Sequence, residues 1–157
     1  MTAKEFLAKY PRLRYKIRLE KMHIQGLYYD TYGLDLPAPI APEDRVQKSP
    51  IDAGDVLIDK IQRLDKDLDK TKEKIDSLIE QCDFIKDVCA KNLSTNELLV
   101  ITEKYFVSPV LTDLKIANKY KYSLAWSQKW TVSAYKTLDQ VLAVMEYNHE
   151  IPEELYK

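Results

Sequence analysis

The chain has 157 residues, which suits one domain or a small domain with an extension and excludes an enzyme built from two large α/β domains. It contains only three glycines, which makes turn-rich sandwiches and barrels a poor fit. Its 24 lysines and arginines nearly balance its 25 aspartates and glutamates, so the net charge of −1 predicts no polyanionic partner and any nucleic-acid site requires local segregation of charge.

Nothing in the sequence predicts a membrane or secretory segment. The N-terminal residues run directly into a charged amphipathic stretch that lacks the apolar core of a signal peptide. The uninterrupted apolar runs elsewhere are far shorter than the roughly 20 residues that cross a bilayer. We therefore expect a cytoplasmic protein with no membrane partner.

The first predicted element is a basic amphipathic helix. Residues 1–23 carry seven lysines and arginines against two glutamates. Pro11 removes one amide hydrogen bond, so we expect this helix either to begin at Pro11 or to kink there. A solvated face on a packed helix is a commoner origin of such a pattern than a membrane-surface or nucleic-acid segment. Its apolar residues recur at the spacing of one helical face: Phe6, Tyr10, Leu13, Ile17 and Ile24.

A Pro-rich loop is predicted over residues 37–50. Four of its residues are prolines, which cannot continue a helix, so the segment is expected to be a long loop or an extended linker. The wider stretch of residues 24–56 also reverses the local charge, with six acidic residues against two basic ones. The first half of the chain is thus a series of segments with unlike charge.

A long helix is predicted to begin at Ser49-Pro50, because serine is a good N-cap and proline suits the first helical position. The residues that follow form the strongest periodic pattern in the chain. Steps of four and three alternate without interruption, which is the heptad pattern of helices that pack along their length. The positions are Leu57, Ile61, Leu64, Leu68, Thr71, Ile75, Leu78, Cys82, Ile85 and Cys89.

This apolar seam is about 50 Å long and needs another helix to cover it. The N-terminal helix could fold back on it as an antiparallel hairpin, or a second copy of the chain could pack there, and the two arrangements are compatible. We favour a hairpin that also forms a homo-oligomer, with a dimer as the preferred state. The predicted oligomerisation residues are Leu57, Ile61, Leu64, Leu68, Ile75, Leu78, Cys82 and Ile85.

The sequence predicts no metal, cofactor or catalytic centre. Cys82 and Cys89 lie seven residues apart in one helix, roughly 10 Å, which is beyond disulfide reach, and they are expected to be small buried apolar groups. His23 and His149 are the only histidines, and neither has a ligand-like spacing to the cysteines. Because the chain also lacks a Gly-rich phosphate loop and a nucleophile in a recognisable setting, we do not expect an enzyme.

Three helices are predicted in the last third of the chain. Ser94 and Glu97 have the spacing of a capping box, so a helix is expected to start there and to break at Ser108-Pro109. Thr112 is a potential N-cap for a short helix, and Ser123 for a longer one. A short helix, a turn of three to four residues and a longer helix are the parts of a helix-turn-helix.

The last third of the chain also contains Tyr105-Phe106, Ile116-Ala117, Ser123 and the pair Ala134 and Leu138. In these residues, the segment 97–142 resembles region 4 of bacterial sigma factors and the C-terminal domain of the RinA/ArpU-like late transcriptional regulators of phages. Upstream, the opening Lys4 to Leu7, the Pro-containing linker, the Ser-Pro helix start and the heptad helix are also similar to that family. Two residues depart from its pattern, since Lys121 stands where such turns usually have glycine and Ser127 stands where an apolar residue is usual.

The local charge agrees with what the resemblance implies. Between residues 108 and 138 there are five lysines and a single acidic residue, Asp113. By analogy with the motif, Gln128 and Lys129 would face the major groove of double-stranded DNA, with Ser127 and Thr131 supporting them. The remaining expected DNA-binding residues, which would contact the phosphates or the backbone around the turn, are Lys115, Lys119, Lys121, Tyr122, Ser123 and Lys136. Tyr120 and Tyr122 could add hydroxyl contacts.

These patterns predict an all-α chain: a helical hairpin or coiled coil over residues 1–92, a sigma-region-4-like helix-turn-helix domain over 93–147 and a tail over 148–157. The function implied by the resemblance is a phage-type regulator that activates late genes in the cytoplasm of a bacterial host, with host RNA polymerase as a further candidate partner. The alternative is a phage assembly or interaction protein. It would be a small-terminase-like packaging subunit, or a coiled-coil inhibitor that binds a host protein through residues 57–89.

Overall fold

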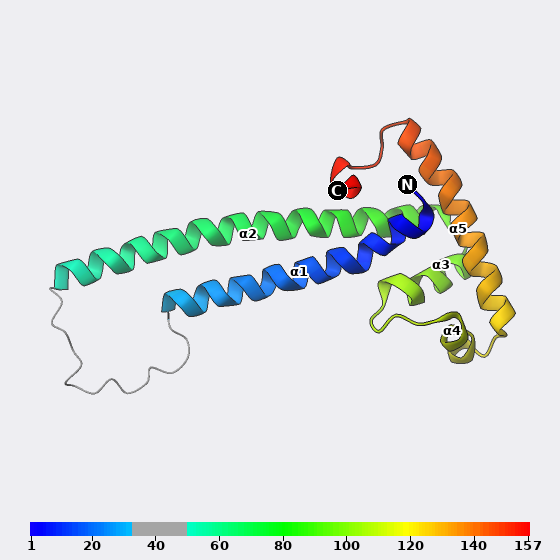
Figure 1. Cartoon of the computed structure of the whole chain (residues 1–157), viewed down its shortest axis with the longest axis horizontal. Coiled ribbons are helices and arrows are strands. Elements are labelled where there is room, and N and C mark those ends of the chain that lie inside the picture. Colours follow the sequence, from blue (N-terminus) through cyan, green and yellow to red (C-terminus); the bar gives the residue numbers. More distant parts are fainter. Residues whose placement is uncertain (33–49) are drawn as a thin grey trace. The chain divides into compact units, whose positions relative to one another are not determined.

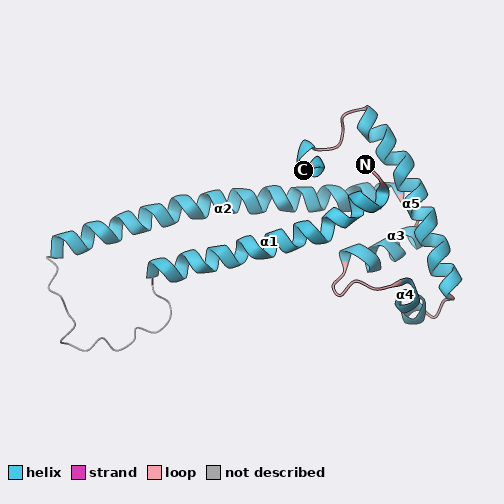
Figure 2. Cartoon of the chain, in the orientation of Figure 1, coloured by secondary structure: helices cyan, strands magenta, loops and turns pink. Residues whose placement is uncertain are grey.

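The structure, a computed structural model, describes residues 1–32 and 50–157, and for residues 50–54 it describes the backbone only. Every regular element in these ranges is helical (Figure 1, Figure 2), so the all-α prediction is confirmed. The Pro-rich loop predicted over 37–50 lies outside the described residues, except for Pro50. The elements are α1 (Ala3–Tyr32), α2 (Pro50–Asn92), α3 (Thr95–Ile101), a π-helical segment (Thr102–Phe106), α4 (Asp113–Tyr120), α5 (Leu124–Tyr147) and a 3-10 turn (Glu153–Tyr156).

Helix α1 begins at Ala3, so the prediction of a start at Pro11 is wrong. The start is fixed by a capping box: the Thr2 amide donates to Glu5 Oε2 at 2.8 Å, and the Glu5 amide donates to Thr2 Oγ1 at 3.3 Å. Pro11 lies within the helix and is exposed. The helix persists across it because apolar residues on both sides of the proline are buried, namely Phe6, Leu7, Tyr10 and Leu13.

The described residues of Lys16–Ser77 form one compact unit, in which the second part of α1 lies beside the first part of α2 (Figure 1). Their contact follows the heptad seam, and an ion pair joins Glu20 of α1 to Lys74 of α2. The polar seam residue Thr71 donates its hydroxyl to the Asp67 carbonyl at 2.8 Å, so its burial leaves no donor unsatisfied. The hairpin thus covers this part of the seam within one chain. The buried residues are Ile17, Leu64, Leu68, Thr71 and Ile75.

The second compact unit combines Met1–Tyr15 with Leu78–Lys157. The predicted division at residue 92 is therefore not where the contacts divide, because the end of α2 packs with the C-terminal helices. Cys82 and Cys89 are buried free thiols, as predicted, and burial raises the pKa of Cys89 to about 12. The largest fully buried side chains of this unit are Phe6, Leu7, Ile85, Ile101, Ile116, Leu138, Leu142 and Leu155.

Residues 148–157 pack onto this unit and do not form a separate tail. Ile151 and Leu155 are buried, and the Ala3 amide near the start of α1 donates to Asp139 Oδ1 of α5 at 2.6 Å. The chain reverses after α5 through His149, whose φ of 56° lies in the left-handed region. The C-terminal residues therefore contribute to the same core as α1 and α5.

The three-helix order of the C-terminal region is as predicted. The Ser94 amide donates to Glu97 Oε2 at 2.9 Å, which is one half of the expected capping box. Helix α4 follows Thr112, and the Ser123 hydroxyl accepts the Trp126 amide at 3.1 Å at the start of α5. Helix α5 packs against both α3 and α4, so its buried face is fixed by these two neighbours.

Candidate nucleic-acid interface

The turn between α4 and α5 has three residues, Lys121, Tyr122 and Ser123. Lys121 adopts φ 59° and ψ 36°, the left-handed conformation in which glycine is usual. The Tyr122 amide donates to the Ala117 carbonyl at 2.9 Å, which ties the turn to the end of α4. A lysine therefore supplies the turn geometry that similar motifs obtain from glycine, at a backbone strain of about 1–2 kcal/mol.

The one acidic residue of this region, Asp113, is turned towards α5. Its Oδ1 accepts the Ser127 hydroxyl at 3.0 Å and the Thr131 hydroxyl at 3.0 Å. The Lys104 ammonium lies 2.9 Å from the same oxygen. Burial opposes ionisation of Asp113, but the hydrogen bonds from Lys104 and Thr131 outweigh it, so its pKa lies below the usual range. The half-buried carboxylate is thus paired with a cation and hydrogen-bonded to α5.

Ser127 and Thr131 do not lie where the sequence interpretation placed them. Both were expected to support base contacts, but their side chains are 0% and 4% exposed. They lie on the buried face of α5 because each donates to Asp113 at the start of α4. Ser127 therefore takes the place of an apolar residue by forming a buried hydrogen bond.

Glu103 of the π-helical segment binds the C-terminal end of α4. Its Oε1 accepts the Lys119 ammonium at 2.7 Å and the Tyr120 hydroxyl at 2.5 Å. These two hydrogen bonds hold the pKa of Glu103 below the usual range. Lys119, which was expected to contact phosphate, and the Tyr120 hydroxyl, which was expected to add a DNA contact, are therefore both engaged within the chain.

The other four predicted lysines are exposed on α4, the turn and α5. Among the residues that the structure describes, Lys115, Lys121 and Lys136 make no ion pair. The Lys129 ammonium lies 5.4 Å from the centre of the Trp130 ring, an arrangement that restrains the side chain without neutralising it. Gln128 is also exposed. This region thus combines four exposed cations with an acid that faces inward.

Two exposed residues of α5 were not among the predicted DNA contacts. Ala125 and Val132 lie on the same face as Lys129 and Lys136, opposite the buried residues of the helix. The sequence could have indicated them, because positions 125, 129, 132 and 136 are spaced by four, three and four. This spacing places them on one helical face, opposite the face of the buried residues.

Tyr122 and Ser123 of the turn differ in whether their hydroxyl groups are engaged within the chain. The ring of Tyr122 is half exposed and stacks on Trp126, with the centroids 4.1 Å apart and the planes at 15°. The Ser123 hydroxyl is engaged as the cap of α5. Tyr122 remains a candidate DNA contact through its exposed ring edge and hydroxyl, whereas Ser123 has a structural role that needs no ligand.

Most of the predicted oligomerisation residues are covered by the chain itself. Ile61 is half-buried and Leu57 is 49% exposed. The seam interpretation was therefore right about packing, but contacts with a second copy are not needed to bury these side chains. The six buried members are Leu64, Leu68, Ile75, Leu78, Cys82 and Ile85.

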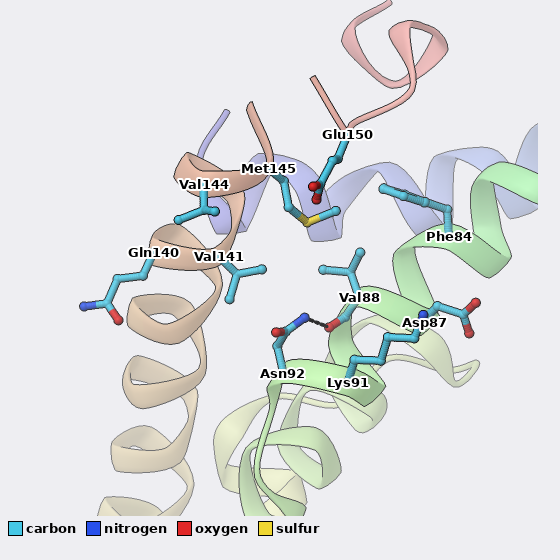
Figure 3. A pocket seen from close by; sticks show the side chains of 10 residues that line it. All are labelled: Phe84, Asp87, Val88, Lys91, Asn92, Gln140, Val141, Val144, Met145 and Glu150. Atoms are coloured by element: carbon cyan, nitrogen blue, oxygen red, sulfur yellow. Dashed lines mark hydrogen bonds between the residues drawn. The ribbon is translucent and has the colours of Figure 1, made fainter. Parts of the chain in front are cut away.

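A groove of about 610 Å³ lies between the last turns of α2 and the second half of α5 (Figure 3). Val88 of α2 faces Val141 and Met145 of α5 across it. The polar groups at its edge include Asp87 and Lys91. The groove thus has an apolar floor and an edge that carries groups of both charges.

The structure adds two observations on the predicted absences. In the ranges it describes, histidine, cysteine, aspartate and glutamate nowhere gather in a group of three or more that could hold a metal ion. None of the helices in those ranges is both long enough and apolar enough to cross a membrane.

Comparisons of the chain with protein-family models, with curated proteins and with solved structures found no match.

Proposed function

We propose that this chain is a DNA-binding transcriptional regulator that places the first half of α5 in the major groove of double-stranded DNA. The observation that carries the proposal is the inward position of Asp113, which is paired with Lys104 and bonded to two hydroxyls of α5. Because the only acid between residues 108 and 138 is half-buried and paired with Lys104, the unpaired exposed charges of this region are all positive. That is the electrostatic requirement of a surface that approaches phosphates.

The exposed residues divide by the contact that each can make. Lys115, Lys121 and Lys136 present flexible ammonium groups suited to phosphates, which position the protein without reading sequence. Gln128 and Lys129 lie on α5 itself and are the candidates for base-edge hydrogen bonds. Tyr122 adds a hydroxyl beside the turn. Ser127, Thr131 and Lys119 have no place in this list, since the chain's own contacts engage them.

The finer assignment follows the resemblance to phage late regulators. In this proposal the protein is a homo-oligomer, with a dimer favoured, that binds beside a late promoter and activates transcription, with host RNA polymerase as a candidate partner. The small-terminase-like alternative also joins DNA binding to oligomerisation, so the number of subunits separates the two. A dimer favours regulation and a closed ring of many subunits favours DNA packaging.

The direct test measures affinity for a fluorescent duplex by anisotropy from low to physiological salt. The triple variant Lys115→Gln, Lys121→Gln and Lys136→Gln is compared with a matched triple variant, Lys66→Gln, Lys70→Gln and Lys72→Gln, of exposed lysines on α2. We expect the slope of log affinity against log salt to fall by about 3 in the first variant, at roughly 0.9 per lost phosphate contact, and to stay unchanged in the second. Equal effects of the two variants, or no binding by the unmodified protein at low salt, would refute the proposal.

The DNA sequence is found by selecting bound duplexes from a randomised pool and sequencing them. Enrichment of one short palindrome or direct repeat would support a regulator and would supply the duplex for further work. Light scattering of the same sample gives the number of subunits, which distinguishes a dimer from a ring.

A further inference from the structure

The outer face of α5 carries methyl groups between two lysines. Ala125, Lys129, Val132 and Lys136 succeed one another at spacings of four, three and four, and extend over about 16 Å of helix. Val132 is 65% exposed, more than any other valine, leucine or isoleucine in the described part of the chain. The lysines lie about one helical turn to either side of it.

Packing within the chain does not account for a valine at position 132. A β-branched residue is a weaker helix former than lysine, glutamate or alanine, because its rotamers are restricted in a helix. The side chain points away from the face that carries Ser127, Thr131, Ala134 and Leu138, which are buried against α3 and α4. Its two methyl groups are therefore available to a partner.

The charges beside Val132 favour DNA over a protein as that partner. The first acidic residue of α5 is Asp139, whose Oδ1 is already bonded to the Ala3 amide. The face therefore offers ammonium groups and methyl groups with no exposed carboxylate among its first turns. In the major groove, phosphates line both edges and the thymine C5-methyl lies on the floor, where small apolar side chains contact it.

We propose that Val132, with Ala125 beside it on the same face, reads thymine by contact with its C5-methyl group. This inference rests on the proposed function, because it requires α5 to enter the major groove. It assigns apolar readout to a helix whose exposed face has few groups for polar readout, namely Gln128 and Lys129. The bound site should then contain thymine at one or two fixed positions.

The experiment replaces each thymine of the selected duplex, one at a time, by deoxyuridine, which removes only the methyl group and keeps the base pair. For the unmodified protein we expect affinity to fall about fourfold at one or two positions, the effect of one buried methyl group. Val132→Ala should bind the thymine and uracil duplexes within about 1.5-fold of each other at the position it reads. Val144→Ala, which alters another exposed valine of α5, should keep the full fourfold difference.

The possible outcomes distinguish thymine readout by Val132 from DNA binding itself. Binding that depends on the lysines but ignores every methyl group would overturn the inference and leave DNA binding intact. The same holds if the selection enriches no thymine, or if Val132→Ala still distinguishes thymine from uracil. Failure of the unmodified protein to bind any duplex would overturn the proposed function and the inference together.

Discussion

Replacing Asp113 by alanine tests whether the carboxylate joins α4 to α5 as the structure indicates. The substitution leaves the buried Ser127 hydroxyl without its acceptor, which costs about 1–3 kcal/mol. It also removes the charge-assisted bond to Lys104, whose side chain is mostly buried. The loss of this bond costs a similar amount of stability. Thr131 is affected less, because its hydroxyl also lies 2.9 Å from the Ser127 carbonyl. We expect the free energy of unfolding to fall by about 3 kcal/mol in total.

The assay is urea unfolding followed by tryptophan fluorescence. Both tryptophans of the chain, Trp126 and Trp130, lie on α5, so the signal reports on the helix that Asp113 contacts. A loss of about 3 kcal/mol corresponds to a decrease in Tm of about 9 °C for a chain of this size. Asp113→Asn retains an oxygen acceptor for the hydroxyls and loses only the charge, so it should be destabilised by about 1 kcal/mol.

Asp69→Ala provides the matched control, since Asp69 is exposed on α2 and its removal should change stability by no more than about 0.5 kcal/mol. If Asp113→Ala unfolds within 1 kcal/mol of the unmodified chain, the carboxylate does not hold α4 and α5 together. An equal effect of Asp113→Asn and Asp113→Ala would instead show that the ion pair with Lys104 dominates and that the hydroxyl bonds contribute little.

Three further predictions follow from the same contacts. Lys121→Val should lose about 1–2 kcal/mol because a β-branched residue is strained in the left-handed region, whereas Lys121→Gly should retain the stability of the unmodified chain in the same urea assay. Glu97, Glu103 and Asp113 are hydrogen-bonded and have lowered pKa values, so the unfolded chain binds more protons in acid. Stability should be flat from pH 8 to 6 and should fall as the pH drops below about 4.5, which a series of thermal melts would show. The two cysteines are buried and desolvation raises their pKa values, so they should react with a thiol reagent only as fast as the chain unfolds, and rapid labelling of the folded chain would contradict their burial.

The helix boundaries of the C-terminal region could be predicted because their signals are local. Glu97 accepts the Ser94 amide and Ser123 accepts the Trp126 amide, each within three residues, and a cap of that kind depends little on the rest of the fold. Thr112 precedes α4 with an extended backbone, but its side chain makes no cap hydrogen bond. The heptad pattern of α2 was equally informative, since the steps of four and three report directly on one buried face. The pattern could not show whether α1 of the same chain or a second copy of the chain packs on that face.

The roles of Ser127 and Lys119 could not be predicted because they depend on partners that are distant along the chain. Ser127 is polar and lies near the start of α5, so by local criteria it belongs to an exposed recognition surface. Its partner, Asp113, is 14 residues away. Lys119 donates to Glu103, which is 16 residues away in the sequence. Glu103 lies in a π-helical segment that the sequence pattern did not predict. The helix start predicted at Pro11 was wrong for a related reason. Burial of the neighbouring apolar residues outweighs the preference of proline for the first turn of a helix.

The three inward carboxylates of the C-terminal region explain how a nearly neutral chain can present a positive surface. Glu97 bonds Ser133 and Thr137, Glu103 bonds Lys119 and Tyr120, and Asp113 bonds Lys104 and two hydroxyls. Each acid therefore joins at least two helical segments, and its charge is engaged by partners within the chain. Stability and surface charge are in this way set by the same residues, so a substitution that weakens the core should also alter the electrostatics of the proposed DNA-binding face.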